Sequence, residues 1–343
     1  MARTPVEVVQ WLGAIQSQDF LAAKWAVGQR ITATTDALVE QAYNAGTILR
    51  THLLRPTWHF VTPDDIRWML ALTAPQVKVK VAYNNRRLGL DQAVLARGNA
   101  VFDKALRGGR HLTREELAPL LIEAGVISAS DDPLRFLHVL INAELDGVVC
   151  SGALHGKQHT YALLEERAPN SRVLEREEAL AALARRYFTS RGPATLKDYI
   201  WWSGLPVTDA RAGLAMIKSQ LVEEKIDGQS YWLDPSSLPA TQEIAPTVHL
   251  LPNYDEYIVG YADRSAIYDP GRVKQVDARG NFLFNHTIVV DGQVAGTWKR
   301  ALRKKSVEIT PNLFYPLSEA EIQALSVEMS HYSDFLGLPR MNS

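Results

Sequence analysis

Two glutamines near the start of the chain, Gln16 and Gln18, form the residue pair whose spacing points most directly to chemistry. Each side-chain amide can both accept and donate a hydrogen bond, so the pair could hold a water molecule. If Ser17 between them is extended, the two amides project in the same direction, whereas in a helix they diverge by about 200°. Periodicity alone favours the other interpretation, in which both are exposed glutamines on a helix over Ala14–Arg30.

A second polar group lies in the segment 53–59, where Arg55 occupies a predicted turn between two strands. Such a hairpin could present Arg55 to a DNA backbone or groove, or Trp58 could be a core residue and Arg55 merely solvated. His52 and His59 flank the turn, and either could contact phosphate. We expect each instead to be a hairpin side chain with a local hydrogen bond.

Several other kinds of site receive little support from the sequence. It contains no glycine-rich phosphate loop, no serine nucleophile elbow and no pair of cysteines to bind a metal. His155 and His159 are four residues apart but lie in a glycine-bearing loop without an obvious carboxylate partner. We therefore expect no metal ion and no cofactor.

The charge is nearly balanced overall but unevenly distributed. The net charge is −1, which by itself argues against a uniformly basic nucleic-acid coat protein or a polybasic membrane binder. However, residues 50–110 carry 11 basic and 4 acidic residues, and residues 264–305 carry 9 and 3, giving +7 and +6. The remainder carries −14. Two basic faces predict a local DNA-binding surface, whereas scattered solvated lysines and arginines are the alternative.

Length and cysteine content suggest a multidomain intracellular protein. At roughly 150 residues per domain, 343 residues predict about two to three domains. Cys150 is the single cysteine, which fits a reducing compartment. The start of the chain lacks an apolar signal core, and no apolar run is long enough to span a bilayer. We expect a cytoplasmic, nucleoid-associated monomer.

A repeated order of helix, helix and two-stranded hairpin is predicted three times before residue 238, which is typical of winged helix-turn-helix units. In the first block, Ile48–His52 and Trp58–Val61 form the hairpin. In the second, Thr113 and Glu116 form a capping box, Asp132-Pro133 begins another helix, and Val148–Ser151 and Thr160–Leu164 are the strands. In the third, Thr195 and Thr208 each cap a helix, and Asp227-Gly228 turns a hairpin. Three unrelated hairpins in a generic α+β protein are the alternative.

Beyond a linker at Ser236–Pro239 the pattern becomes β-rich, with strands expected at Leu250-Leu251, Tyr257–Val259, Phe282–Phe284, Thr287–Val290 and Val294–Trp298. A helix over Ser318–Glu328 closes the chain. The predicted fold is therefore α+β, with three tandem winged helix-turn-helix units and a small C-terminal antiparallel β-barrel. The expected domains are 1–90, 91–170, 171–238 and 239–343.

Taken together, these segments resemble the AlkZ/YcaQ family of winged-helix DNA glycosylases over nearly the whole chain. The resemblance rests on the early Gln-x-Gln, the Arg-Pro-Thr-Trp-His hairpin, the stretch from Tyr254-Asp255-Glu256-Tyr257 to Asp263-Arg264-Ser265, and the late Val-Asp-Gly-Gln-Val-Ala-Gly-Thr-Trp hairpin. It implies excision of N7-alkylated purines from double-stranded DNA and unhooking of some interstrand crosslinks. The family's catalytic pair corresponds to Gln16 and Gln18, with Ser17 where the family typically has an aliphatic residue.

The resemblance makes a metal-free, hydrolytic and lyase-free reaction the favoured hypothesis. An N7-alkylated base is already cationic and leaves as a neutral group, so neutral amides that place a water near C1′ suffice. The residues expected to contact DNA are Arg50, Arg55, Trp58, His59, Arg86, Arg87, Arg264, Lys299 and Arg300. A non-catalytic winged-helix regulator is the main alternative, and a protein-interaction scaffold is a weaker one.

Overall fold

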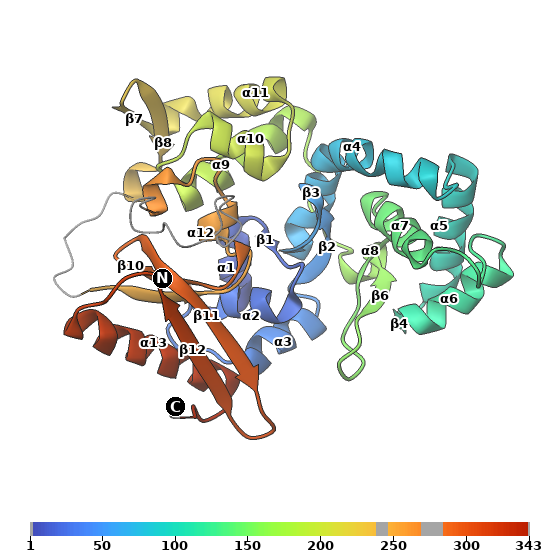
Figure 1. Cartoon of the computed structure of the whole chain (residues 1–343). Coiled ribbons are helices and arrows are strands. Elements are labelled where there is room, and N and C mark those ends of the chain that lie inside the picture. Colours follow the sequence, from blue (N-terminus) through green and yellow to red (C-terminus); the bar gives the residue numbers. More distant parts are fainter. Residues whose placement is uncertain (1–2, 238–245, 269–283, 342–343) are drawn as a thin grey trace.

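The computed structural model describes residues 3–237, 246–268 and 284–341. Segments rich in helix occupy the first two thirds of the chain, and a four-stranded sheet with one long helix forms the last third (Figure 1). The residues up to 61 lie at the centre, between the segment 112–163, the segment 194–233 and the C-terminal part. No helix within the described ranges is long and apolar enough to cross a bilayer.

The same arrangement of elements occurs three times. A short strand or bridge residue is followed by two helices and a hairpin, and it pairs with the second strand of that hairpin. The first unit contains β1 (Ile15–Gln16), α2 (Phe20–Gly28), α3 (Asp36–Asn44), β2 (Leu49–Leu53) and β3 (Arg55–Val61). The second contains β4 (Leu112–Thr113), α6 (Arg114–Glu123), α7 (Pro133–Leu145), β5 (Val149–Ser151) and β6 (Thr160–Leu163). The third contains Ala194, α10 (Leu196–Ser203), α11 (Val207–Ile217), β7 (Val222–Ile226) and β8 (Gln229–Leu233).

Other helices connect these units. They are α1 (Pro5–Leu12), α4 (Pro63–Arg87), α5 (Gln92–Leu106), α8 (Leu164–Arg167) and α9 (Arg176–Arg191), with short 3-10 turns at Lys218–Gln220 and Pro235–Ser237. Helix α4 starts with Pro63 in its first turn and with Asp64 and Asp65 beside it. Acids at the start and Arg86 and Arg87 in the last turn complement the helix dipole, which helps a 25-residue helix to persist.

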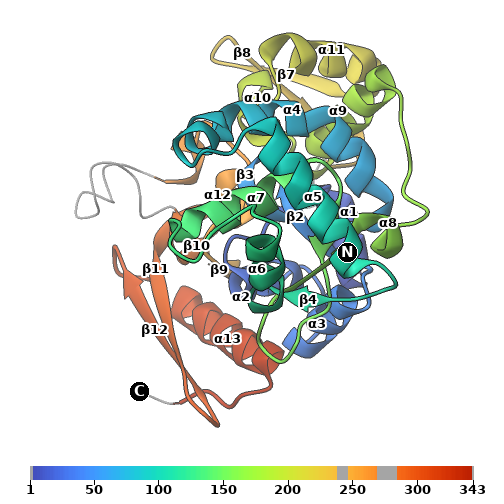
Figure 2. The ribbon, with the colours of Figure 1, turned by 90° about the vertical axis from the view of Figure 1, so that its right-hand side faces the viewer.

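The C-terminal strands form an open sheet in the order β12-β11-β10-β9, so the predicted closed barrel is wrong for the described residues. The elements are β9 (Val248–Leu251), α12 (Glu256–Val259), a 3-10 turn at Ser265–Ile267, β10 (Thr287–Val290), β11 (Gln293–Leu302), β12 (Val307–Leu313) and α13 (Glu319–Leu336). Helix α13 packs along this sheet (Figure 2), where the Tyr332 ring meets Trp298 at 5.0 Å. Alternating strands are common to sheets and barrels, and the sequence does not show whether the edge strands meet.

The hydrophobic cores run across the predicted domain boundaries. One core joins the first and third units through Leu49, Trp68, Tyr187 and Trp202. Another joins the first unit to the C-terminal sheet through Trp25, Phe60 and Trp298. The boundaries stay predictions, but the packing fixes the first unit on two sides.

Four local predictions differ from the structure. The expected helix over Ala14–Arg30 begins only at Phe20, because Asp19 accepts from the Ala22 amide and caps it there. The expected strand at Tyr257–Val259 is part of α12, which Asp255 caps in the same way. Helix α11 begins at Val207 after Pro206 instead of being capped by Thr208, and α13 continues to Leu336. Residues 282–283 of the expected strand and Leu238-Pro239 of the linker lie outside the described residues.

Candidate active site

Gln16 and Gln18 lie on either side of an extended residue. The Ser17 amide donates to the Trp58 carbonyl at 2.7 Å, which continues the pairing of β1 with β3 beyond Gln16. Ser17 is fully buried, Gln16 is half-buried and Gln18 is exposed. Because alternate residues of an extended chain share a face, the two glutamine side chains project to the same side. The structure thus has the extended geometry and not the helical one.

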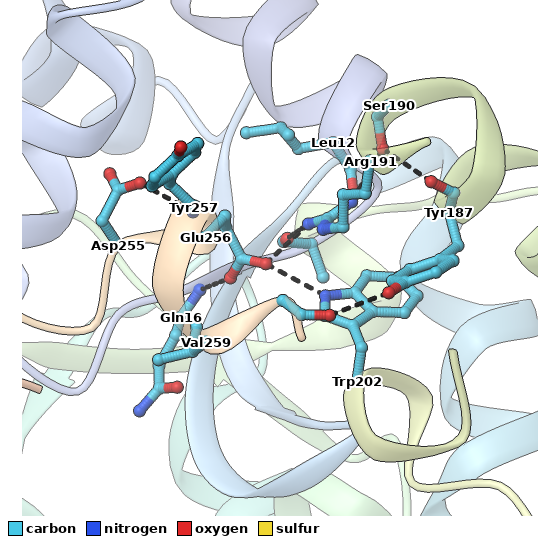
Figure 3. A network of polar contacts seen from close by, with 12 residues as sticks. Leu12, Gln16, Tyr187, Ser190, Arg191, Trp202, Asp255, Glu256, Tyr257 and Val259 are labelled. Atoms are coloured by element: carbon cyan, nitrogen blue, oxygen red, sulfur yellow. Dashed lines mark hydrogen bonds and ion pairs between the residues drawn. The ribbon is translucent and has the colours of Figure 1, made fainter. Parts of the chain in front are cut away.

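A buried ion pair of Glu256 and Arg191 anchors the backbone of Gln16 (Figure 3). The Gln16 amide donates to Glu256 Oε1 at 2.9 Å, while Arg191 and Trp202 donate to Glu256 Oε2 at 2.6 and 3.0 Å. Glu256 is 2% exposed. Arg191 also donates to the carbonyls of Leu12 and Ala14, so it holds the chain just before β1. The first unit, the third unit and α12 therefore converge on one residue.

Arg55 fixes the side chain of Gln16. Its Nη2 donates to Gln16 Oε1 at 3.2 Å, and its Nη1 donates to the Trp202 carbonyl at 3.0 Å. Because a guanidinium has donors only, the amide atom that faces it must be the oxygen. The Gln16 amide nitrogen is left to donate elsewhere, and Figure 3 shows the amide group pointing away from Glu256.

The two faces of the β1-β3-β2 sheet separate the predicted DNA-contacting residues. Arg55 and His59 lie on the face of Gln16, which pairs directly with His59. Arg50 and Trp58 lie on the other face, where the Arg50 guanidinium is 4.4 Å from the Trp58 ring. Arg50 also donates to the Ser17 carbonyl at 3.0 Å, so it supports the glutamine segment from behind.

His59 is a buried, neutral neighbour of Gln16. Burial and the positive charge of Arg55 hold the pKa of His59 well below its usual 6.5. Its Nδ1 lies 2.9 Å from the Thr57 carbonyl and must therefore carry the proton. The expected local hydrogen bond is thus present. For His52 the expected local hydrogen bond is wrong, since its Nδ1 contacts the buried carboxylate of Glu144 on the distant helix α7.

Comparison with known proteins identifies the family to which the chain belongs. The family model described as "DNA glycosylase AlkZ-like" matches residues 9–335. The chain belongs to the AlkZ-like DNA glycosylases. The Streptomyces sahachiroi protein named "Interstrand DNA cross-link repair glycosylase" is 23% identical over 347 residues, covering 98% of this chain and 91% of that protein. The solved structure of Streptomyces sahachiroi DNA glycosylase AlkZ superimposes with a TM-score of 0.76 at 20% identity, covering 99% of this chain and 94% of that one.

In this AlkZ-like chain, the other residues expected to contact DNA are spread over several elements. Arg86 and Arg87 are exposed at the end of α4, and Lys299 is exposed on β11. Arg264 is half-buried and donates to the Ile258 carbonyl, with its guanidinium 5.2 Å from the Trp201 ring. Arg300 contacts the Tyr332 hydroxyl. Their contacts with DNA stay predictions, and the burial of Arg50 and His59 (7% and 0% exposed) disfavours direct contact by these two.

The weak metal-binding signal at His155 and His159 gains no support from the geometry. His159 packs edge-on against Phe20, with ring centroids 4.8 Å apart, and burial lowers its pKa to about 4. Within the described ranges, no three histidine, cysteine or carboxylate side chains gather to hold a metal.

Three residues of the AlkZ-like site escaped sequence reasoning as functional candidates: Glu256, Arg191 and Trp202. Glu256 lies in the polar stretch 250–265 that supported the resemblance, but its sequence neighbours gave no sign that it binds the Gln16 backbone 240 residues away. Arg191 ends a helix and Trp202 belongs to a capped helix, so both look structural from local pattern. The one usable signal was the position of Glu256 within the stretch that carried the family resemblance.

Proposed function

We propose that this chain hydrolyses the N-glycosidic bond of N7-alkylated purines in double-stranded DNA, with Gln16 and Gln18 as its catalytic residues. The observation that carries the proposal is the extended backbone at Ser17 between the two glutamines, with the Gln16 amide fixed by Arg55 and Gln18 exposed. Because the Gln16 oxygen is occupied, Gln16 acts as a donor through its amide nitrogen. Gln18 has both its donor and its acceptor available for the reaction.

The different roles of Gln16 and Gln18 follow from what the attacking water requires. A water that attacks C1′ keeps one lone pair directed at the sugar, so its hydrogens and its second lone pair must be held by the protein. In our proposal the Gln18 oxygen accepts a hydrogen bond from the water and the Gln16 amide nitrogen donates to its second lone pair. The proton released as the C1′–O bond forms and the base departs passes to solvent. The alkylated base departs as a neutral group, so no strong acid is needed at the leaving nitrogen. The enzyme is accordingly monofunctional, leaving an intact abasic site.

The rest of the chain supplies the DNA-binding surface. The threefold order of short strand, two helices and hairpin supports three winged-helix units, each of which could place a helix or a hairpin on duplex DNA. The basic region 50–110 surrounds the Arg55 hairpin and supports backbone binding near Gln16. We further propose that crosslinked purines are substrates, because a relative of 23% identity is named for interstrand crosslink repair.

The decisive experiment is a base-release assay on duplexes carrying different N7-alkylguanines, including a crosslink. We expect free modified base from the wild type, and a decrease of about 10²-fold or more for Gln16→Ala and for Gln18→Ala, with DNA affinity nearly unchanged. Gln323→Ala is the matched control, because Gln323 is an exposed glutamine on α13. It should release base at the wild-type rate.

Three results would contradict this assignment. If no lesion is processed at stoichiometric enzyme and the protein selects one undamaged sequence, it is a winged-helix regulator. If both glutamine variants match the wild type, the catalytic residues lie elsewhere. Trapping of a covalent DNA adduct by borohydride would show a lyase and exclude the hydrolytic mechanism.

A further inference from the structure

Arg55 is a half-buried cation whose observed hydrogen-bond partners are neutral. Its two hydrogen bonds go to a backbone carbonyl and to the Gln16 amide oxygen. Among the described residues, no carboxylate lies within ion-pair distance of it. Burial lowers the pKa of Arg55 from 12.5, partly offset by Glu256, and an arginine side chain in a protein stays charged at neutral pH. Enclosing a charge without a counter-charge is costly, which indicates that an anion belongs beside it.

Lys80, an exposed cation without a described carboxylate partner, lies at the same helix end as Arg55. It projects from α4, and a Cβ placed on Gly204 would lie only 3.4 Å from its Nζ. Gly204 lies two positions after Trp202, and the Trp202 carbonyl accepts a hydrogen bond from Arg55. Burial and the positive charge of Arg55 lower the pKa of Lys80 from 10.5. The two cations therefore flank the same helix end, that of α10.

The α10 carbonyls offset part of this charge, but only by partial charges at a helix end. The neighbouring carboxylate, Glu256, is already paired with Arg191 at 2.6 Å. An arginine and a lysine at one helix end can together bind a phosphate, since the guanidinium contributes paired donors and the ammonium a compact charge. In a DNA glycosylase the available anion is a phosphodiester.

We propose that Arg55 and Lys80 together bind one phosphodiester of the lesion nucleotide and hold it beside Gln16. This rests on the proposed function, because the lesion must lie at Gln16. The bound phosphate has a catalytic consequence: without it, the Arg55 charge would oppose the positive sugar that forms as the base departs. Neutralised by phosphate, Arg55 orients Gln16 without that penalty. Lys80 is thus a binding residue whose loss lowers the rate of base release as well as DNA affinity.

The test pairs a protein variant with a chemical change in the DNA. Duplexes carry one N7-methylguanine and a neutral methylphosphonate at either the 5′ or the 3′ linkage of that nucleotide. We expect Lys80→Ala to lose about tenfold in single-turnover base release on normal DNA, and the salt slope of binding to decrease by about 1. At one of the two linkages the methylphosphonate should slow the wild type to a similar extent but slow Lys80→Ala much less, because the contact is already missing.

Lys78→Ala is the matched control, because Lys78 lies on the same helix but pairs with Asp146. Its effect should be small and should multiply with that of either methylphosphonate. The proposal would be overturned if the effect of Lys80→Ala multiplied with the effect of each methylphosphonate, because the two changes would then be independent. It would also be overturned if Lys80→Ala left the salt slope unchanged and only lowered the thermal midpoint, because Lys80 would then merely cap α10. If the wild type releases no base, the proposed function fails, and the salt slope still tests the phosphate contact.

Discussion

At the scale of single residues, Glu256 links the backbone of the candidate site to the rest of the molecule. One of its carboxylate oxygens accepts a hydrogen bond from the Gln16 amide, and the other accepts hydrogen bonds from Arg191 and Trp202. Glu256 and Arg191 are both almost fully buried, so each charge depends on the other. Breaking such a pair by removing one partner leaves an uncompensated buried charge.

We therefore predict that Glu256→Gln lowers the free energy of unfolding by about 3–5 kcal/mol, because Arg191 loses its counter-charge. Urea denaturation at neutral pH measures this. Adding Arg191→Met should recover part of the loss, because it removes the stranded charge. Asp103→Asn, which breaks the exposed pair with Arg107, serves as the control and should change little. A loss in the double variant equal to the sum of the two single-variant losses would show that the pair is not coupled.

At the scale of elements, the β2–β3 hairpin is positioned by its contact with the end of α10. Leu54, at the hairpin turn, has φ +60°, an uncommon value for a residue with a side chain. Its carbonyl lies against Gly204, which has φ +68° and ends α10 in the left-handed conformation. A Cβ on Gly204 would lie 2.3 Å from the Leu54 oxygen. The close approach sets where Arg55 begins β3, and hence where it meets Gln16.

Gly204→Ala should accordingly displace the hairpin. An alanine there meets both the left-handed strain of about 1–2 kcal/mol and a backbone clash that costs about 1–3 kcal/mol more. Gly337→Ala isolates the strain, since Gly337 has φ +64° with nothing within 4 Å of the added carbon. We expect Gly204→Ala to lower thermal stability more than Gly337→Ala and to slow base release, which the control leaves unchanged. Equal stability and rates for the two variants would remove the hairpin contact as a positioning device.

At the scale of the whole molecule, near-neutrality conceals an uneven charge distribution and a set of uncharged histidines. The first basic region covers the hairpin and α4, whereas part of the second lies outside the described residues. Burial lowers the pKa of five histidines: His59 well below 6.5, His159 and His286 to about 4, and His111 and His138 by less. Each stays neutral in the folded chain at pH values where the unfolded chain protonates it.

These shifts predict a loss of stability in mild acid. A group whose pKa is lowered by folding binds more protons when unfolded, so stability falls as the pH decreases below about 6.5 and continues to fall toward 4. His331 opposes this, because the hydrogen bond that it donates to the Glu328 carboxylate raises its pKa, and its contribution is lost as the pH rises. With five histidines against one, the urea midpoint should decrease from pH 7 to pH 4.5. A midpoint that is constant over this range would contradict the buried, neutral state of these side chains.

Features that depend on neighbouring residues were predictable from the sequence. The capping box of Thr113 and Glu116 begins α6, and that of Thr195 and Asp198 begins α10, as expected. Asp227 and Gly228 turn the β7–β8 hairpin with positive φ angles. The order of two helices and a hairpin was likewise visible in each unit. Capping, turn chemistry and strand alternation act over a few residues, so short stretches of sequence encode them.

Only the tertiary structure decided how distant segments meet at Gln16. The sequence singled out Gln16, Gln18 and Arg55, but not that Arg55 takes the Gln16 oxygen or that Glu256 binds the Gln16 backbone. The open C-terminal sheet was also beyond local pattern, since closure depends on whether two edge strands meet. Contacts between residues up to 240 positions apart are set by the packing of whole elements. The residue types therefore indicated the chemistry of the site, whereas the packing of the elements around these residues determined its geometry.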